Sequence, residues 1–249
     1  MAQHRAVLIL SGGMDSTVLA YELVSFTADV HAISFDYGQR HKKELEYAAA
    51  TAKRLGFQHD VVDLSGVARL LAQSGSSLVS TTDVPEGHYA QDSMKATVVP
   101  NRNMMMLSIA AAVAVAEERE TVSIGVHAGD HFIYPDCRPE FIQAAHTAVR
   151  TGNEGFGASG GTRVVAPYLS CTKADIAYAG FLVGMPFQTT WSCYKGGDFH
   201  CGRCGTCVER LEAIDEAWQR IKKEGIKASR DATVYEDPTF WKTQVGAKR

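Results

Sequence analysis

The sequence has no excess of positive charge and no long apolar run. Lysine and arginine number 25 against 28 acidic residues, a formal net charge of -3, which argues against a surface dedicated to nucleic acid. The most apolar stretch, residues 109–116, is followed at once by Glu-Glu-Arg-Glu and predicts a buried helix rather than a membrane span. The apolar run near the N-terminus is too short for a secretory signal. We therefore expect a cytoplasmic protein whose partners include neither a membrane nor nucleic acid.

Cysteine is scarce outside one segment. Of the six cysteines, four lie between Cys193 and Cys207. In a reducing compartment such a group indicates a metal site rather than disulfides. Cys137 and Cys171 stand alone, which is more typical of small packing residues. With 249 residues, 45% of them hydrophobic, the chain is large enough for one α/β domain, with or without a small appended module.

Strand patterns alternate with helical patterns along the first 150 residues. The strand patterns cover residues 5–10, 30–35, 59–64 and 121–126, and the helical patterns cover residues 15–26, 42–55, 102–118 and 139–149. This alternation predicts right-handed crossovers and a doubly wound, mostly parallel sheet covered on both faces. In such folds the ligand lies at the C-terminal ends of the strands. Two polar stretches, residues 74–95 and 151–162, interrupt the pattern and predict mobile loops.

The first strand leads directly into the string Ser-Gly-Gly-Met-Asp-Ser, which opens a helix. Glycine lets such a turn approach a ligand closely, and free N–H groups and the helix dipole then face a phosphate. A plain junction with a serine or aspartate cap is the simpler interpretation, but the full string favours phosphate binding. No GK[ST] follows, so this is not a Walker A motif. The predicted pyrophosphate-binding residues are Ser11, Gly12, Gly13, Met14, Asp15, Ser16 and Thr17.

Within this loop, Asp15 and Ser16 are the catalytic candidates. The carboxylate of Asp15 could hold a magnesium ion that bridges phosphate oxygens, or it could orient the loop. The hydroxyl of Ser16 adds a hydrogen-bond donor. Further along the chain, Arg102 and Lys173 are candidate phosphate contacts, although a solvated lysine is nearly as good an interpretation of Lys173.

The cysteine cluster has the spacing C-x7-C-x2-C-x2-C. Four thiolates form a closed tetrahedral shell around zinc, so we predict a structural zinc ion at Cys193, Cys201, Cys204 and Cys207. An iron–sulfur cluster stays open, because thiolates alone do not select the metal. A redox pair and unrelated buried cysteines are further alternatives. His200 is a candidate substitute ligand.

Four further polar strings stand at predicted element ends or beside the cysteines. They are FDYGQ (35–39), VPNRN (99–103), YPDCRPEF (134–141) and TWSCY (190–194). Any one of them alone is more typical of a turn with capping groups.

Together, the motifs resemble two nested groups of enzymes. The Ser-Gly-Gly-Met-Asp-Ser loop resembles that of the ATP pyrophosphatase superfamily. The YPDCRPEF string, and TWSCYKG running into the cysteine cluster, resemble the 7-cyano-7-deazaguanine synthase family over nearly the whole chain. The resemblance implies an adenine nucleotide alpha hydrolase-like α/β domain over residues 1–186. A small zinc-binding region over residues 187–249 would pack on it.

The resemblance also implies an activity. Such an enzyme would convert 7-carboxy-7-deazaguanine and ammonia to 7-cyano-7-deazaguanine in queuosine biosynthesis, using ATP with Mg²⁺ to adenylate first the acid and then the amide. The implied substrate-binding residues are Asp130, Tyr134, Asp136, Arg138 and Glu140. A capping cluster, in which Asp136 and Glu140 pair with Arg138 and the helix dipole, is the simpler alternative.

The chain departs from the family pattern at two places. Asn101 stands where the family has glycine after Val-Pro, and Phe132-Ile133 replace a Ser-Gly pair before Tyr-Pro. The second change touches the loop from Asp130 to Ile133, so substrate identity is less well fixed than the fold.

Two other functions remain open on the sequence. A tRNA-modifying thiolase would need two metal-free cysteines and a basic surface. A non-catalytic nucleotide-binding module would have no need of Asp15 and the polar strings. The oligomeric state is not fixed by the sequence, which allows a homodimer.

Overall fold

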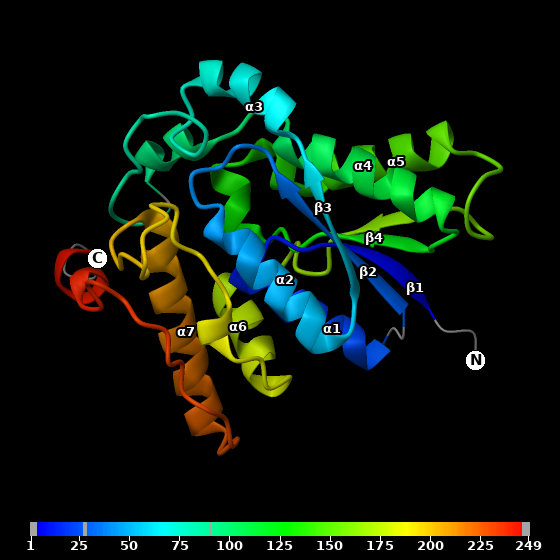
Figure 1. Cartoon of the computed structure of the whole chain (residues 1–249). Coiled ribbons are helices and arrows are strands. Elements are labelled where there is room, and N and C mark those ends of the chain that lie inside the picture. Colours follow the sequence, from blue (N-terminus) through cyan, green and yellow to red (C-terminus); the bar gives the residue numbers. More distant parts are fainter. Residues whose placement is uncertain (1–3, 27–28, 90, 246–249) are drawn as a thin grey trace.

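Five parallel strands form the centre of the molecule. The computed structural model describes residues 4–26, 29–89 and 91–245 (Figure 1). The order across the sheet is β3-β2-β1-β4-β5, and every strand pairing is parallel. The strands are β1 (Arg5–Ile9), β2 (Asp29–Asp36), β3 (Gln58–Asp63), β4 (Thr121–Ser123) and β5 (Arg163–Val165). The predicted doubly wound α/β fold is confirmed, and its strand order reverses between β1 and β4.

Helices cover both faces of the sheet. The longer helices are α1 (Met14–Phe26), α2 (Lys43–Leu55), α3 (Ser65–Leu71), α4 (Arg102–Ala116), α5 (Pro139–Gly152), α6 (Lys173–Leu182) and α7 (Gly205–Lys223). Val7 and Ile9 of β1 pack in one core with α4 and α5, whereas Leu8 packs in a second core with α1, α2, α6 and α7. The alternation of side chains along a strand therefore supplies both cores from one apolar run.

The structure differs from the predicted elements at several points. The strand predicted over residues 121–126 ends at Ser123, because the chain then turns against the start of α1, where a Cβ on Gly125 would lie 3.2 Å from the backbone nitrogen of Ser16. The segment predicted as a loop over residues 74–95 contains short 3-10 turns and buries Leu78 and Met94. Helices α3 and α7 and strand β5 were not predicted.

No helix within the described part of the chain combines the length and the apolar character needed to cross a membrane.

A buried arginine of α7 binds the C-terminal segment through hydrogen bonds. Arg210 is fully buried, and its guanidinium donates to the Tyr235 hydroxyl (2.9 Å), to Thr190 Oγ1 (2.6 Å) and to the carbonyl of Phe187 (2.7 Å). A buried guanidinium is tolerated only where its donors are paired. Arg210 therefore links α7 to the segments on either side of it.

The turn between β1 and α1 depends on a glycine in the left-handed region. Gly12 has a φ of 83°, and a Cβ there would lie 2.1 Å from the carbonyl oxygen of Glu44 on α2. Only glycine combines that conformation with so close a backbone approach. Gly56, at the end of α2, has a φ of 72° but nothing within 4 Å of such a Cβ.

We expect Gly12→Ala to destabilise the protein more than Gly56→Ala does. The control should cost about 1–2 kcal/mol, from left-handed strain alone. At Gly12 the collision with Glu44 should add about 1–3 kcal/mol, as overpacked sites usually do. Urea unfolding of both variants measures the difference. Equal losses in the free energy of unfolding would show that the contact between α2 and the turn does not restrict Gly12.

Candidate active site

A cavity opens at the C-terminal ends of β1, β2 and β4. Its wall includes the turn after β1, the start of α4 and residues of the cysteine-rich segment such as Trp191 and Thr206. This is the point at which the strand order reverses, where doubly wound sheets bind their ligands.

Hydrogen bonds from its own hydroxyl groups fix the conformation of the predicted phosphate loop. Ser11 Oγ lies 3.0 Å from Ser16 Oγ and accepts the N–H of Gly13 at 3.2 Å. Thr17 already donates its backbone N–H to the Gly13 carbonyl, so regular helix bonding begins there. Met14 opens the helix with a buried side chain. The turn thus points the first backbone donors of α1 toward the cavity.

Lys173 joins this loop to α7. Its ammonium lies 3.0 Å from Asp15 Oδ2 and 3.0 Å from Glu209 Oε2. Burial would lower the pKa of Lys173, but the carboxylates of Asp15, Glu209 and Asp130 raise it well above its usual range. The lysine is therefore a fixed positive charge beside the phosphate loop.

Two buried polar atoms of the loop have no hydrogen-bond partner among the described residues. They are Asp15 Oδ1 and Thr17 Oγ1. Buried polar atoms are nearly always paired in a complete site. The second oxygen of Asp15, directly beside the one that binds Lys173, is thus free to accept a ligand or a cation.

An aspartate on the cavity wall is held by a fully buried histidine. His127 Nδ1 accepts the N–H of Gly129 (3.0 Å), so the ring carries its proton on Nε2, which faces Asp130 Oδ1 at 3.6 Å. Tyr89 donates its hydroxyl to the same oxygen at 3.0 Å. Burial would raise the pKa of Asp130, but the neighbouring His127 and Lys173 lower it. Asp130 therefore presents a carboxylate to the cavity.

Arg102 reaches the cavity from the first turn of α4. Its guanidinium lies over the Tyr134 ring, 5.8 Å from the centroid, and no carboxylate of the described residues is within ion-pair distance. The residue before it, Asn101, has a φ of 56°, the left-handed conformation that glycine adopts most easily. Asparagine tolerates this conformation better than most other residues do, so the position can hold it in place of glycine.

The structure divides the predicted substrate-binding residues into two groups. Asp130 and Tyr134 line the cavity, whereas Asp136, Arg138 and Glu140 are not among its lining residues. Asp136 instead accepts the backbone N–H of Asn103 (3.0 Å) in the first turn of α4. Arg138 and Glu140 are exposed, and neither pairs with Asp136. The substrate contacts of these three residues stay a prediction.

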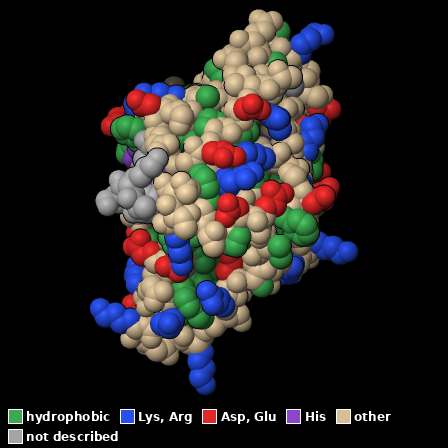
Figure 2. All heavy atoms as spheres, turned by 90° about the vertical axis from the view of Figure 1, so that its left-hand side faces the viewer, with side chains coloured by type: hydrophobic (Ala, Val, Ile, Leu, Met, Phe, Trp, Pro, Cys, Tyr) green, Lys and Arg blue, Asp and Glu red, His purple; other side chains and the backbone are tan. Residues whose placement is uncertain are grey.

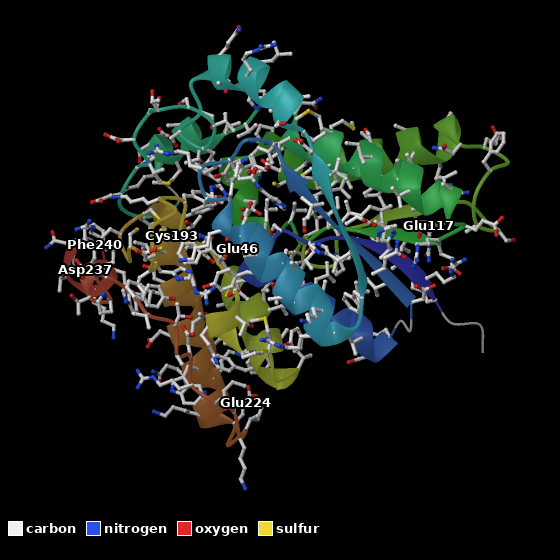
Figure 3. The ribbon with its side chains drawn as sticks, in the orientation of Figure 1. Glu46, Glu117, Cys193, Glu224, Asp237 and Phe240 are labelled. Atoms are coloured by element: carbon white, nitrogen blue, oxygen red, sulfur yellow. The ribbon has the colours of Figure 1, made fainter. Side chains whose placement is uncertain are left out.

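The four cysteines meet in a buried cluster. The Sγ atoms of Cys193, Cys201, Cys204 and Cys207 all lie within 4.8 Å of one another. Backbone N–H groups point at sulfur, as from Cys204 to Cys201 Sγ (3.2 Å). Cys193, labelled in Figure 3, lies beside the N-terminal end of α7. The donor set can therefore hold a metal ion.

His200 does not belong to this cluster. Its Nε2 accepts the backbone N–H of Ser192 (3.1 Å), and its ring packs on Trp191 with centroids 4.4 Å apart. Burial lowers its pKa to about 3. The ring is a packing and hydrogen-bonding group in the segment that connects the cysteines to the cavity.

Several residues of the site were not predicted from the sequence. Glu209, His127 and Tyr89 stand in no polar string, and Tyr89 lies in the stretch that was predicted to be a mobile loop. Only Glu209 had a usable signal, since it follows Cys207 by two positions and a metal at the four cysteines would fix the chain there.

Comparison with known proteins identifies relatives along nearly the whole chain. The model of the family "queuosine biosynthesis protein QueC" matches residues 5–218. A 7-cyano-7-deazaguanine synthase of Brucella anthropi is 48% identical over 241 residues (97% of each chain), and 7-cyano-7-deazaguanine synthase 1 of Mesorhizobium japonicum is 52% identical over 236 residues (95% of each). Among solved structures, an NMN synthetase from Francisella tularensis aligns with a TM-score of 0.48 and 15% identity, covering 96% of this chain and 84% of that one. The predicted resemblance is confirmed: this chain belongs to the QueC family of queuosine biosynthesis enzymes.

Proposed function

We propose that this chain converts 7-carboxy-7-deazaguanine, ammonia and ATP into 7-cyano-7-deazaguanine. The observation that carries the proposal is the carboxylate of Asp15, bound to Lys173 through one oxygen and unpartnered at the other, in the turn where a pyrophosphate would dock. The curated relatives bear the name of this synthase, which supplies the substrate class.

The chemistry calls for two activations by ATP. A carboxylate is a poor electrophile, so AMP is first transferred to its oxygen and pyrophosphate leaves. Ammonia then attacks the carbonyl carbon, the bond to AMP breaks, and a proton is released with the amide. A second transfer of AMP to the amide oxygen, followed by loss of AMP and a proton, leaves the nitrile.

The protein contributes positioning and charge neutralisation. The backbone donors of residues 11–17, the ammonium of Lys173 and the guanidinium of Arg102 would hold the leaving pyrophosphate. Magnesium bound with ATP would neutralise phosphate charge, and Asp15 Oδ1 is the free carboxylate oxygen that fits it. Ser16, next to Asp15, would donate to a phosphate oxygen.

Asp130 and Tyr134 are the proposed readers of the deazaguanine. A carboxylate accepts the N–H and amino edge of a purine-like base well, and Asp130 is held as a carboxylate inside the cavity. Asp136 would act indirectly. It accepts a backbone N–H in the first turn of α4 and so positions Arg102. Arg138 and Glu140 would reach the substrate only if their segment moved.

We further propose that the cysteine cluster holds structural zinc and that residues 187–249 form a region distinct from the α/β domain of residues 1–186. Four thiolates with no open position suit zinc. A cytoplasmic location fits four clustered cysteines that serve as metal ligands rather than as disulfides, and a homodimer is the proposed assembly.

Lys173→Met should lower ATP–pyrophosphate exchange about 100-fold, the usual cost of a lost transition-state donor. Lys223→Met, an exposed lysine at the end of α7, is the matched control and should leave exchange unchanged. If Lys173→Met catalysed ATP–pyrophosphate exchange at the same rate as the control, the assignment of Lys173 to the pyrophosphate site would be wrong.

Cys204→Ser should lower the metal content and destabilise the C-terminal segment, because three ligands leave the shell open. Elemental analysis of the unaltered protein should return about one zinc per chain. The control is Cys171→Ser, which removes a half-buried thiol outside the cluster. Iron and sulfide in place of zinc would contradict the proposal.

Asp130→Asn should weaken the binding of 7-carboxy-7-deazaguanine by the free energy of a charged hydrogen bond, ~1.5–3 kcal/mol. The KM for this substrate should rise accordingly, and the KM for ATP should change little. Steady-state kinetics should show a much smaller effect for Glu140→Gln, whose carboxylate is exposed. The reverse ranking would mean that the segment from Asp136 to Glu140 closes over the base.

A further inference from the structure

The turn after β2 and the first turn of α2 place two buried titratable side chains on the cavity wall. His41 and Glu44 are 3% and 9% exposed, and both line the cavity, where the backbone of Glu44 packs against the phosphate loop at Gly12. His41 Nε2 lies 3.4 Å from Glu44 Oε2, and Gln39 donates to Glu44 Oε1 at 3.1 Å. Neither side chain has a role in adenylation as set out above.

His41 has one nitrogen without a partner. Its Nδ1 is buried and accepts or donates no hydrogen bond among the described residues. When Nε2 carries the proton and faces Glu44, Nδ1 presents a bare lone pair. A buried lone pair on a cavity wall is a site for a small hydrogen-bond donor.

The proposed reaction needs such a donor. Ammonia must attack the acyl adenylate as the neutral molecule, whereas near neutral pH the solution holds mainly ammonium. The ion must therefore shed a proton inside the cavity, away from the phosphates, and its nitrogen must then be held close to the adenylate.

We propose that His41 and Glu44 form the ammonia subsite and a relay that deprotonates ammonium. The ammonium gives a proton to His41 Nδ1, and the proton on Nε2 passes to Glu44 Oε2. Ammonium, neutral imidazole and carboxylate thereby become ammonia, neutral imidazole and carboxylic acid. The ammonia then accepts a hydrogen bond from the Nδ1–H of the new tautomer, and its lone pair becomes free for the adenylate when the molecule turns away from the ring. The inference rests on the proposed function.

The surroundings suit this exchange. Burial lowers the pKa of His41 to about 3, so the ring passes a proton on rather than retaining it. Burial raises the pKa of Glu44 to about 8, despite the hydrogen bond from Gln39 and the charge of Arg102, which lower it. With a pKa of about 8, Glu44 is ionised in a fraction of the molecules near neutral pH, and that ionised form accepts the proton. The positive Arg102 also disfavours ammonium relative to ammonia at this place.

A purely structural role is the competing interpretation. Gln39 accepts the N–H of Tyr37 and donates to the carbonyl of Phe35, so Glu44 could merely complete the turn. In that case its loss would disturb ATP binding and amide formation together. An effect confined to the ammonia step would not follow.

Glu44→Gln separates the two interpretations, with Glu46→Gln as the matched control. Glu46 lies on the same helix with an exposed carboxylate (Figure 3). Three rates are measured: ATP–pyrophosphate exchange, amide formation from ammonium at neutral pH, and hydroxamate formation from hydroxylamine, which is already unprotonated there. His41→Phe, which keeps a ring against Tyr194 but has no nitrogen, is the second variant.

We expect both variants to lose amide formation about 100-fold, the usual contribution of a general base, while exchange and hydroxamate formation persist. Equal losses in all three rates, or amide formation at the rate of Glu46→Gln, would overturn the subsite. Absence of exchange and hydroxamate in the unaltered enzyme would instead overturn the proposed function.

Discussion

The site depends on the ion pairs of one lysine. Lys173 sits at the start of α6, and its ammonium contacts Asp15 of the phosphate loop and Glu209 of α7, each at 3.0 Å. Three elements distant in sequence are thereby fixed at one point. Removing a single partner from such a buried group leaves the others uncompensated, so the geometry of the loop and of α7 is coupled.

The cysteine cluster determines where Glu209 stands. Cys204 caps α7 and Cys207 lies in its first turn, so a metal at the four thiolates would fix the start of the helix two residues before Glu209. The same segment reaches the phosphate loop by a second route, since Trp191 donates its backbone N–H to the carbonyl of Gly12 at 2.8 Å. The cysteine cluster is thus part of the support of the active site.

The surface seen in Figure 2, near the C-terminal region, mixes acidic and basic side chains and forms no continuous basic field.

The sequence was sufficient to predict the parts that follow from local patterns. Buried strands, amphipathic helices and the Ser-Gly-Gly turn are each encoded within a few neighbouring residues, and β1, β2 and β3 match their predicted ranges within one or two residues. Helix α7 was missed although Arg210, Ala213, Ala217 and Ile221 follow helical spacing, because its first turn coincides with the CxxC pattern. Tyr89 could not be predicted, since only the folded chain brings it to Asp130. His127 lies three residues before Asp130, but it stands outside the polar strings and was missed for that reason.

The polar string from Tyr134 to Glu140 shows why a motif locates a site more reliably than it assigns roles. Side chains along an irregular segment point in different directions, so Tyr134 faces the cavity while Asp136 caps α4 through Asn103. That cap fixes the turn in which Asn101 takes its left-handed conformation and Arg102 extends over the Tyr134 ring. A carboxylate that positions another residue can therefore be as necessary to the site as one that binds the ligand. Asp136 sets the direction of the only cation that reaches the cavity from α4 among the described residues.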